Sequence, residues 1–120
     1  MPQTHRLYCP SSTKNWLELI RTGVKTIDNR SYSEKRRAMK VGDIIEFWND
    51  TDTSVMAQIV GFAISDTFTS LYSFINPKDT GFDSAEEIEG VMGKFFSQEE
   101  LQEVGVVGIK IKLVGQSENK

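Results

Sequence analysis

The sequence predicts an α+β fold, a small mixed β-barrel of about five or six strands with an N-terminal helix and two or three short later helices. Three observations carry this prediction. Short β-rich runs recur along the chain, helical patterns are inserted between them without regular alternation, and 120 residues suit a single core. We therefore expect a closed or nearly closed barrel rather than a doubly wound sheet.

The chain is expected to form one domain, residues 1–120, with a core over about 5–114 and a polar tail over 115–120. No apolar run approaches the ~18 residues that a membrane-spanning helix needs. The first residues lack the pattern of a secretory signal, so we expect a cytoplasmic protein with no membrane partner. Cys9 is the only cysteine, which excludes an internal disulfide and a thiolate zinc site, and no metal or cofactor is predicted.

The first predicted elements are a strand, a helix and a second strand. Residues 5–9 form a short strand that ends at Pro10, because proline cannot donate to a ladder. The stretch SSTKNWLELIRTG predicts a helix of about three turns, with Ser or Thr as the N-cap and Gly23 as the stop. The run KTIDNR then predicts a strand whose alternation places on opposite faces Lys25, Ile27 and Asn29, and Thr26, Asp28 and Arg30.

The middle of the chain predicts a loop, a hairpin and a short helix. Residues 31–40 have no apolar period and are expected to form a loop. A Gly-Asp turn leads into a strand over 44–48, and a hairpin through 49–54 joins it to a largely apolar strand, expected to be central. Residues 67–75 carry apolar side chains at helical spacing and predict a helix that stops before Pro77.

The last part of the chain predicts two capped helices and the clearest strand. Ser84 with Glu87, and Ser97 with Glu100, have the spacing of capping boxes. Because acidic residues are favoured at helix N-termini, most of the acids here receive a structural explanation. Residues 106–113 alternate apolar side chains with others, which places two lysines on the exposed face.

Positive and negative charges are separated along the chain. Residues 21–40 hold seven Lys and Arg residues and two acids, whereas residues 76–104 hold eight acids and two bases. The net charge is −3, which disfavours broad nonspecific binding of nucleic acid, but the basic segment can attract a phosphate-bearing ligand. The alternative is that both segments are solvated faces that neutralise each other.

The order of these elements resembles the ASCH domain family, whose barrel is similar to the PUA domain of RNA-modifying enzymes. The resemblance covers nearly the whole chain. Its most specific parts are a VGD motif at residues 41–43 and a Gly-x-Lys-x-x-acid-x-Arg pattern, matched by Gly23, Lys25, Asp28 and Arg30. The resemblance implies a PUA-like barrel with a cleft beside the first helix, lined by the Lys, acid and Arg of this pattern.

The resemblance also implies two classes of function. Members of the family are thought to bind RNA or nucleotide-like ligands; some resemble amidohydrolases that act on acetylated cytidine, and some resemble ribonucleases. Lys25 matches the lysine that the amidohydrolases use in catalysis. We therefore expect an RNA- or nucleotide-binding domain. The alternative is a small hydrolase of modified nucleosides or RNA, with Lys25 and Asp28 as its acid/base pair.

Residue chemistry adds a set of candidate ligand-binding side chains. An arginine can bind a phosphate or a base edge through two hydrogen bonds, and a tyrosine among polar residues can stack on a base. The alternative for the cleft is a purely structural ion pair of Lys25 or Arg30 with Asp28. The candidates are Lys25, Asp28, Arg30, Tyr32, Arg36 and Arg37.

Two further residues and a third hypothesis complete the predictions. Trp48 is assigned to the core or rim of the barrel, and His5, which has no partner nearby in sequence, is assigned no role as ligand or base. The third hypothesis is an adaptor whose acidic helices dock a protein partner. The oligomeric state and the natural ligand stay open.

Overall fold

The structure, a computed structural model, describes residues 2–10, 14–51 and 53–117. These residues form a five-stranded mixed sheet with several helices, so the α+β class and the number of strands are confirmed. The strands are β1 (Thr4–Tyr8), β2 (Ile27–Ser31), β3 (Ile44–Trp48), β4 (Ser54–Ser65) and β5 (Val106–Ser117).

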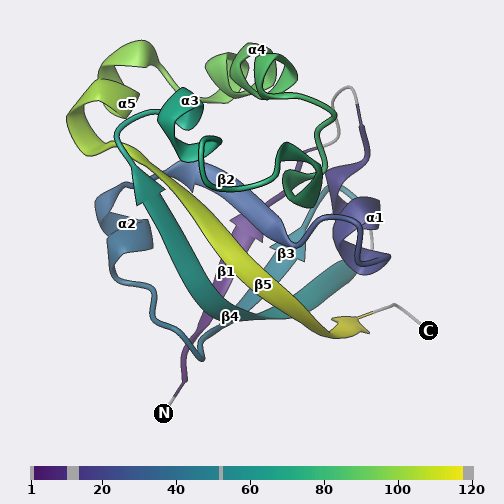
Figure 1. The fold of residues 1–120 in the computed structure, drawn as a ribbon. Helices are drawn as coiled ribbons and strands as arrows, with labels where there is room; N and C mark the ends of the chain where they lie inside the picture. Colours follow the sequence, from purple (N-terminus) through teal and green to yellow (C-terminus); the bar gives the residue numbers. More distant parts are fainter. Residues whose placement is uncertain (1, 11–13, 52, 118–120) are drawn as a thin grey trace.

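The strand order in the sheet is β1-β3-β4-β5-β2, with β4 in the centre as predicted (Figure 1). Among the described strands, only β1 and β3 pair in parallel; their other pairings are antiparallel, and the predicted hairpin joins β3 to β4. Two register shifts in the long β4–β5 pair are of the kind that bends a sheet. The sheet therefore curls into a half-barrel.

The two edge strands of the half-barrel, β1 and β2, do not pair with each other in the part of the chain that the structure describes. They come close at one end, where Arg30 of β2 donates a hydrogen bond of 2.9 Å to the backbone oxygen of Tyr8 in β1. A side chain thus bridges the seam that a strand ladder would close in a complete barrel. The structure therefore confirms a small barrel-like sheet, which stays open between β1 and β2 in the described residues.

Helix α1 (Trp16–Arg21) has six residues and is shorter than the predicted length of about three turns. Asn15 caps it by accepting a hydrogen bond of 3.2 Å from the N–H of Glu18, so the helix starts later than expected. The predicted Ser or Thr cap falls on residues 11–13, which lie outside the described residues. Gly23 follows the helix with a φ of 83°, which confirms the predicted stop.

The segment predicted as a loop after β2 contains one helical turn, α2 (Glu34–Arg37). The prediction is wrong here because α2 buries no residue, so its sequence shows no apolar period. The turn nevertheless fixes the direction of a basic side chain, as described below.

Of the later helices, the two capped ones agree with the predictions, whereas the helix expected over 67–75 has only four residues and a 3-10 helix over 77–80 was not expected. Ser84 and Ser97 each cap a helix by accepting a hydrogen bond from the N–H three residues later. In Figure 1 the helices over 68–71, 85–95 and 98–104 lie together at one side of the sheet, next to β2 and β5. The elements are α3 (Phe68–Leu71), the 3-10 helix η1 (Pro77–Thr80), α4 (Ala85–Phe95) and α5 (Gln98–Val104).

One continuous hydrophobic cluster joins the sheet to α1, α3 and α4, with Phe47 and Ile109 fully buried in it. Lys110 and Lys112 are exposed, as the alternation of the last strand predicts. Strand β5 continues to Ser117, within the segment predicted as a polar tail. Over the described ranges, no helix combines the length and the hydropathy that crossing a bilayer requires.

Candidate functional site

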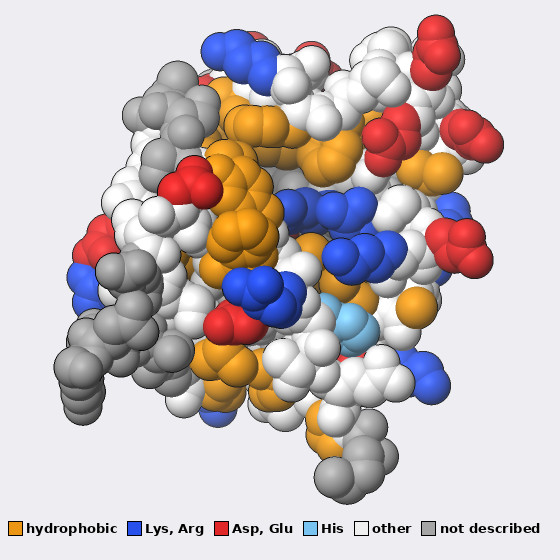
Figure 2. Space-filling model, turned by 180° about the vertical axis from the view of Figure 1, so that it is seen from behind, with side chains coloured by type: hydrophobic (Ala, Val, Ile, Leu, Met, Phe, Trp, Pro, Cys, Tyr) orange, Lys and Arg blue, Asp and Glu red, His pale blue; other side chains and the backbone are white. Residues whose placement is uncertain are grey.

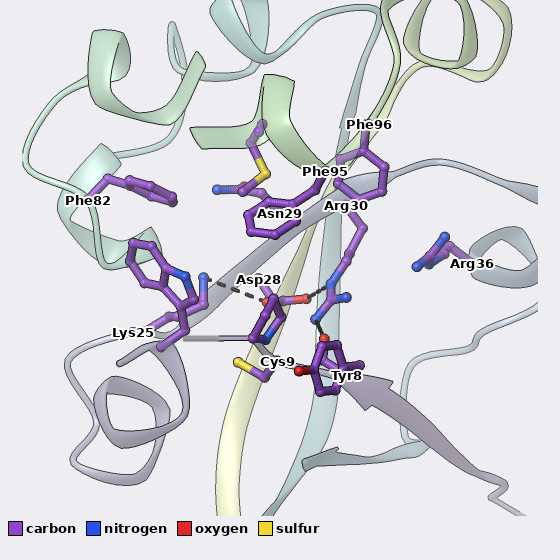
Figure 3. Close-up of a pocket in the computed structure, with 13 residues that line it drawn as sticks. Tyr8, Cys9, Lys25, Asp28, Asn29, Arg30, Arg36, Phe82, Phe95 and Phe96 are labelled. Atoms are coloured by element: carbon purple, nitrogen blue, oxygen red, sulfur yellow. Dashed lines mark hydrogen bonds and ion pairs between the residues drawn. The ribbon is translucent and has the colours of Figure 1, made fainter. Parts of the chain in front are cut away.

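A cavity of about 220 Å³ lies at the seam between the end of β1 and β2 (Figure 3). Three consecutive residues of β2, Asp28, Asn29 and Arg30, line it together with residues from β1, α1, α2 and α4. The cavity therefore lies where the incomplete barrel leaves an edge strand uncovered.

The backbone of β2 shows which groups face this edge. Ile111 donates to the oxygen of Thr26 at 2.9 Å, and Tyr32 donates to the oxygen of Gly105 at 3.0 Å. Since hydrogen-bonded pairs alternate along an antiparallel ladder, the even-numbered residues of β2 turn their backbone groups toward β5. The N–H and C=O of Asn29 consequently point to the free edge.

Lys25 lies just before β2, so strand alternation does not fix the direction of its side chain. Its Nζ lies 3.7 Å from a carboxylate oxygen of Asp28 and donates to the backbone oxygens of Ile27 at 2.9 Å and Thr80 at 2.8 Å. The prediction that Lys25 shares a face with Ile27 and Asn29, opposite Asp28, is therefore wrong. Burial lowers the pKa of Lys25, and the carboxylate of Asp28 opposes this shift.

Asp28 and Arg30 point the same way, as strand alternation predicts. Nε of Arg30 donates to Oδ2 of Asp28 at 2.7 Å, and Asp28 is only 4% exposed. Burial alone would raise the pKa of Asp28, but the charges of Arg30 and Lys25 together outweigh burial and lower it. The predicted ion pair is thus present as a buried pair, and a cavity remains beside it.

Aromatic side chains form the apolar part of the cavity. The rings of Trp16 and Phe82, both buried, lie with their centroids 4.6 Å apart. Phe95 is 43% exposed, and Figure 3 places it with Phe96 on the side of the cavity opposite Tyr8. The cavity therefore offers flat apolar surfaces next to a group of charges.

Arg36, on the short helix α2, brings a further positive charge to the cavity. Its Nη1 donates to the hydroxyl of Ser33 at 2.9 Å, whereas its buried Nε has no hydrogen-bond partner among the described residues. Burial, reinforced by repulsion from Arg30, lowers the pKa of Arg36. Figure 2 shows Lys and Arg side chains beside hydrophobic ones on this face of the molecule.

Tyr32 and Arg37, the other two candidates, do not line the cavity in the described part of the chain. The guanidinium of Arg37 lies 4.2 Å from the centroid of the Tyr32 ring and donates to the backbone oxygens of Tyr32 and Val104, each at 3.0 Å. The structure thus brings four of the six candidates together. The two that it leaves out stabilise the junction between α2 and α5.

Sequence reasoning missed Asn29 as a residue of the site. Asn29 lines the cavity and is 4% exposed, yet neither its Nδ2 nor its Oδ1 has a hydrogen-bond partner among the described residues. The hydroxyl of Tyr72 also has no partner of hydrogen-bond geometry; burial raises the pKa of Tyr72, and the nearby amide of Asn29 opposes this shift. The sequence did offer one indication of a special role: Asn29 lies on the same predicted strand face as Ile27, where an apolar residue is expected.

Cys9 lines the cavity as well but has the properties of a small hydrophobic residue, as predicted. Burial, with a contribution from the charge of Asp28, raises the pKa of Cys9 to about 12. The thiol is therefore protonated near neutral pH.

Trp48 and His5 lie outside the cavity. Trp48 packs against Tyr8, with ring centroids 4.8 Å apart, and stacks under the guanidinium of Arg6. Nε2 of His5 lies 2.8 Å from Oδ2 of Asp43, a partner distant in sequence. This contact joins the start of β1 to the turn before β3.

No carboxylate from residues 76–90 reaches Lys25 within the part of the chain that the structure describes. This segment instead contributes the backbone oxygen of Thr80, and its side chains Asp83 and Glu87 pair with Lys14 at 3.3 and 3.1 Å. Among the described residues, no three His, Cys, Asp or Glu side chains lie close enough together to hold a metal ion.

Two solved structures are similar to this chain over almost their whole length. The crystal structure of hypothetical protein PH0355 is 29% identical, covers 95% of this chain and 100% of its own, and superimposes with a TM-score of 0.77. The solution NMR structure of protein PF0455 from Pyrococcus furiosus is 26% identical, covers 92% of this chain and 97% of its own, with a TM-score of 0.73. No protein-family model matches, and no curated protein is similar in sequence. The fold therefore recurs as a unit in two other proteins, whose names state no function.

Proposed function

We propose that this protein is an ASCH-like domain of the PUA-like class that binds a nucleotide, free or within RNA, in the cavity beside β2. The observation that carries the proposal is the convergence of Asp28, Arg30 and Arg36 with aromatic side chains around one small opening. Phosphate recognition needs guanidinium groups, and base recognition needs flat apolar walls. Both lie within the same cavity.

The size and lining of the cavity suit a single base. Its volume of about 220 Å³ is below the roughly 300–1,000 Å³ of sites for drug-sized ligands. Trp16, Phe82 and Phe95 offer ring faces on which a base can stack, and stacking contributes about 1–3 kcal/mol per base. The remainder of a nucleotide or RNA strand would then lie outside, over the exposed face.

The charges at the cavity suit an anionic group. Arg30 already bonds to Asp28 and Tyr8, whereas the buried Nε of Arg36 has no partner among the described residues. Because Arg30 and Arg36 repel each other, a phosphate between them would stabilise both. A cytoplasmic location, where nucleotides and RNA are available, belongs to the same proposal.

Neighbouring arginines on α2 provide a matched test of this site. Arg36 lines the cavity, whereas Arg37 is engaged by Tyr32 and Val104 outside it. We expect Arg36→Ala to weaken the binding of nucleoside monophosphates and short single-stranded RNA about ten-fold or more, and Arg37→Ala to leave it unchanged. Titration calorimetry at two salt concentrations measures both, and equal effects of the two substitutions would remove Arg36 from the proposal.

Hydrolysis of a modified nucleoside or RNA is the second candidate function for the same cavity. It is supported by the position of Lys25, whose Nζ lies 3.7 Å from a carboxylate oxygen of Asp28 at the cavity and whose pKa is lowered by burial, against the opposing effect of that carboxylate. Incubation with acetylated cytidine and with RNA tests it, because Lys25→Met must then abolish turnover. If the protein binds nucleotides but turns over neither substrate, hydrolysis is excluded and nucleotide binding is the remaining function.

A further inference from the structure

Asn29 is a buried amide that the described part of the protein leaves without hydrogen bonds. It is 4% exposed, and neither its donor nor its acceptor atom has a partner there. The hydroxyl of Tyr72 is also buried without a hydrogen-bond partner of good geometry; it lies close enough to the amide of Asn29 for this contact to lower the pKa of Tyr72, against the larger effect of burial. Buried polar groups are normally paired, because an unpaired one loses its hydration and gains nothing in return.

The position of Asn29 places its unpaired amide beside the cavity. Asn29 lies between Asp28 and Arg30 on β2 and lines the same cavity, and its backbone N–H and C=O face the free edge of the strand. In Figure 3 its side chain is drawn on the side of β2 where Phe82 and Phe95 also lie. An unpaired amide beside stacking surfaces is suited to the edge of a ring whose faces those surfaces cover.

We infer that Asn29 recognises the ligand of this cavity, by pairing its side-chain amide with a ring edge that carries a hydrogen-bond donor beside an acceptor. Ring amides and aminated ring nitrogens have such edges, and nucleobases are the common ligands that combine them with flat faces. The inference rests on the proposed function and names the residue that gives it specificity.

The chemistry of the amide fits this role. The carboxamide offers an acceptor oxygen and a donor nitrogen side by side, so it can form two parallel hydrogen bonds with one edge. Because the amide can be rotated by 180°, it accepts the donor and acceptor in either order. The hydroxyl of Tyr72 supplies a third polar atom.

Access to the amide requires a small movement of neighbouring side chains. The amide atoms of Asn29 and the Tyr72 hydroxyl have no contact with solvent in this structure. Met92, on α4, lines the cavity and has a flexible, unbranched side chain that can adopt other rotamers. Phe95, on the same helix, is exposed and able to turn outward.

The test compares the wild type with Asn29→Leu, which keeps the branching and the number of side-chain heavy atoms and removes both polar atoms. The probes are adenosine, guanosine, cytidine and uridine, followed by a base-methylated analogue of the nucleoside that binds best, with its edge N–H blocked. Affinity is measured by titration calorimetry, and the melting temperature without ligand is measured in parallel. Tyr72→Phe is the companion variant.

We expect the Leu variant to bind its best nucleoside about ten-fold or more weakly, as for a lost two-bond contact, and to melt at a higher temperature because an unpaired buried amide is gone. The methylated analogue should bind the wild type equally weakly. Unchanged affinity of Asn29→Leu, or full affinity of the methylated analogue, overturns the inference and leaves the proposed function standing. A lower melting temperature with unchanged affinity shows that the amide is structural. If the wild type binds none of the four nucleosides and none of their 5′-monophosphates, the proposed function fails and the inference fails with it.

Discussion

Arg30 joins the two edges of the half-barrel by donating from Nη2 to the backbone oxygen of Tyr8 at 2.9 Å. Its Nε simultaneously holds the carboxylate of Asp28 at 2.7 Å, so one guanidinium closes the seam and balances a buried charge. The cavity lies directly at this seam. The geometry of the candidate site therefore depends on the same contacts that hold the two edge strands together.

Loss of the Arg30 guanidinium should destabilise the fold strongly. Arg30→Met leaves Asp28 buried with only Lys25 as a charged partner, and removal of one member of a buried pair costs about 3–5 kcal/mol. Arg6→Met, which removes an exposed pair with Glu46, is the control and should cost about 1 kcal/mol or less. Urea unfolding measures the free energy of unfolding of both variants. Equal losses would show that the contacts of Arg30 at the seam contribute no more to stability than an exposed ion pair.

Two glycine substitutions should have opposite effects on stability. A Cβ at Gly108 in β5 would lie 2.9 Å from Cγ2 of Ile27, so Gly108→Ala should destabilise the protein by about 1–3 kcal/mol and disturb β2. A Cβ at Gly90 in α4 meets no heavy atom of the described residues within 4 Å, apart from its chain neighbours and its own helix backbone, so Gly90→Ala should stabilise the protein by about 0.5–1 kcal/mol. Chemical denaturation of both variants checks the signs, and a stable Gly108→Ala would contradict the close packing of β2 on β5.

Asp43 should make stability depend on pH in the acid range. Hydrogen bonds from His5 and from the backbone N–H groups of Gln3 and Lys40 lower the pKa of Asp43 from 3.8 to about 2. Since the folded pKa is the lower one, this stabilisation is complete above about pH 5 and is lost as the pH falls through about 4 to 2.

The corresponding measurement is the difference in free energy of unfolding between the wild type and Asp43→Asn at several pH values. We expect the difference to be constant above about pH 5 and to shrink between about pH 4 and 2. Asp66→Asn, at an exposed position, is the control. A difference that does not change with pH would mean that the contacts of Asp43 do not favour its ionised form.

Phe95 should contribute to binding without contributing much to folding. It is 43% exposed and lines the cavity, so Phe95→Ala should weaken nucleotide binding by about 1–3 kcal/mol, the usual range for one stacked base. Phe74, which is 59% exposed and does not line this cavity, provides the matched control Phe74→Ala. Calorimetric titration measures the nucleotide affinity of both variants. If Phe95→Ala binds as tightly as Phe74→Ala, Phe95 makes no stacking contact.

Most elements of the fold could be predicted because their signals are local. The serine caps at Ser84 and Ser97, the stop at Gly23 and the alternation of β5 each depend on residues within a few positions. The turn α2 could not be predicted because its residues bury nothing. Its consequence for the site, the position of Arg36 at the cavity, depends on tertiary structure.

The candidate site was predictable only where alternation applies. Asp28 and Arg30 lie two residues apart within β2 and share a face, as expected. Lys25 lies before the strand, so its direction is set by the backbone oxygens of Ile27 and Thr80, the latter from a distant segment. The sequence does not show that the amide of Asn29 lacks hydrogen-bond partners, because the partners of a buried group depend on the folded chain.

The two tryptophans of the chain allow the most direct test of the central claim, that the cavity beside β2 binds a nucleotide. Trp16 lines the cavity, whereas Trp48 does not line it and packs behind Tyr8, which does. We expect titration with nucleoside monophosphates to shift the indole N–H resonance of Trp16 saturably and that of Trp48 much less. No shift of either resonance, or a shift of Trp48 alone, would contradict the claim.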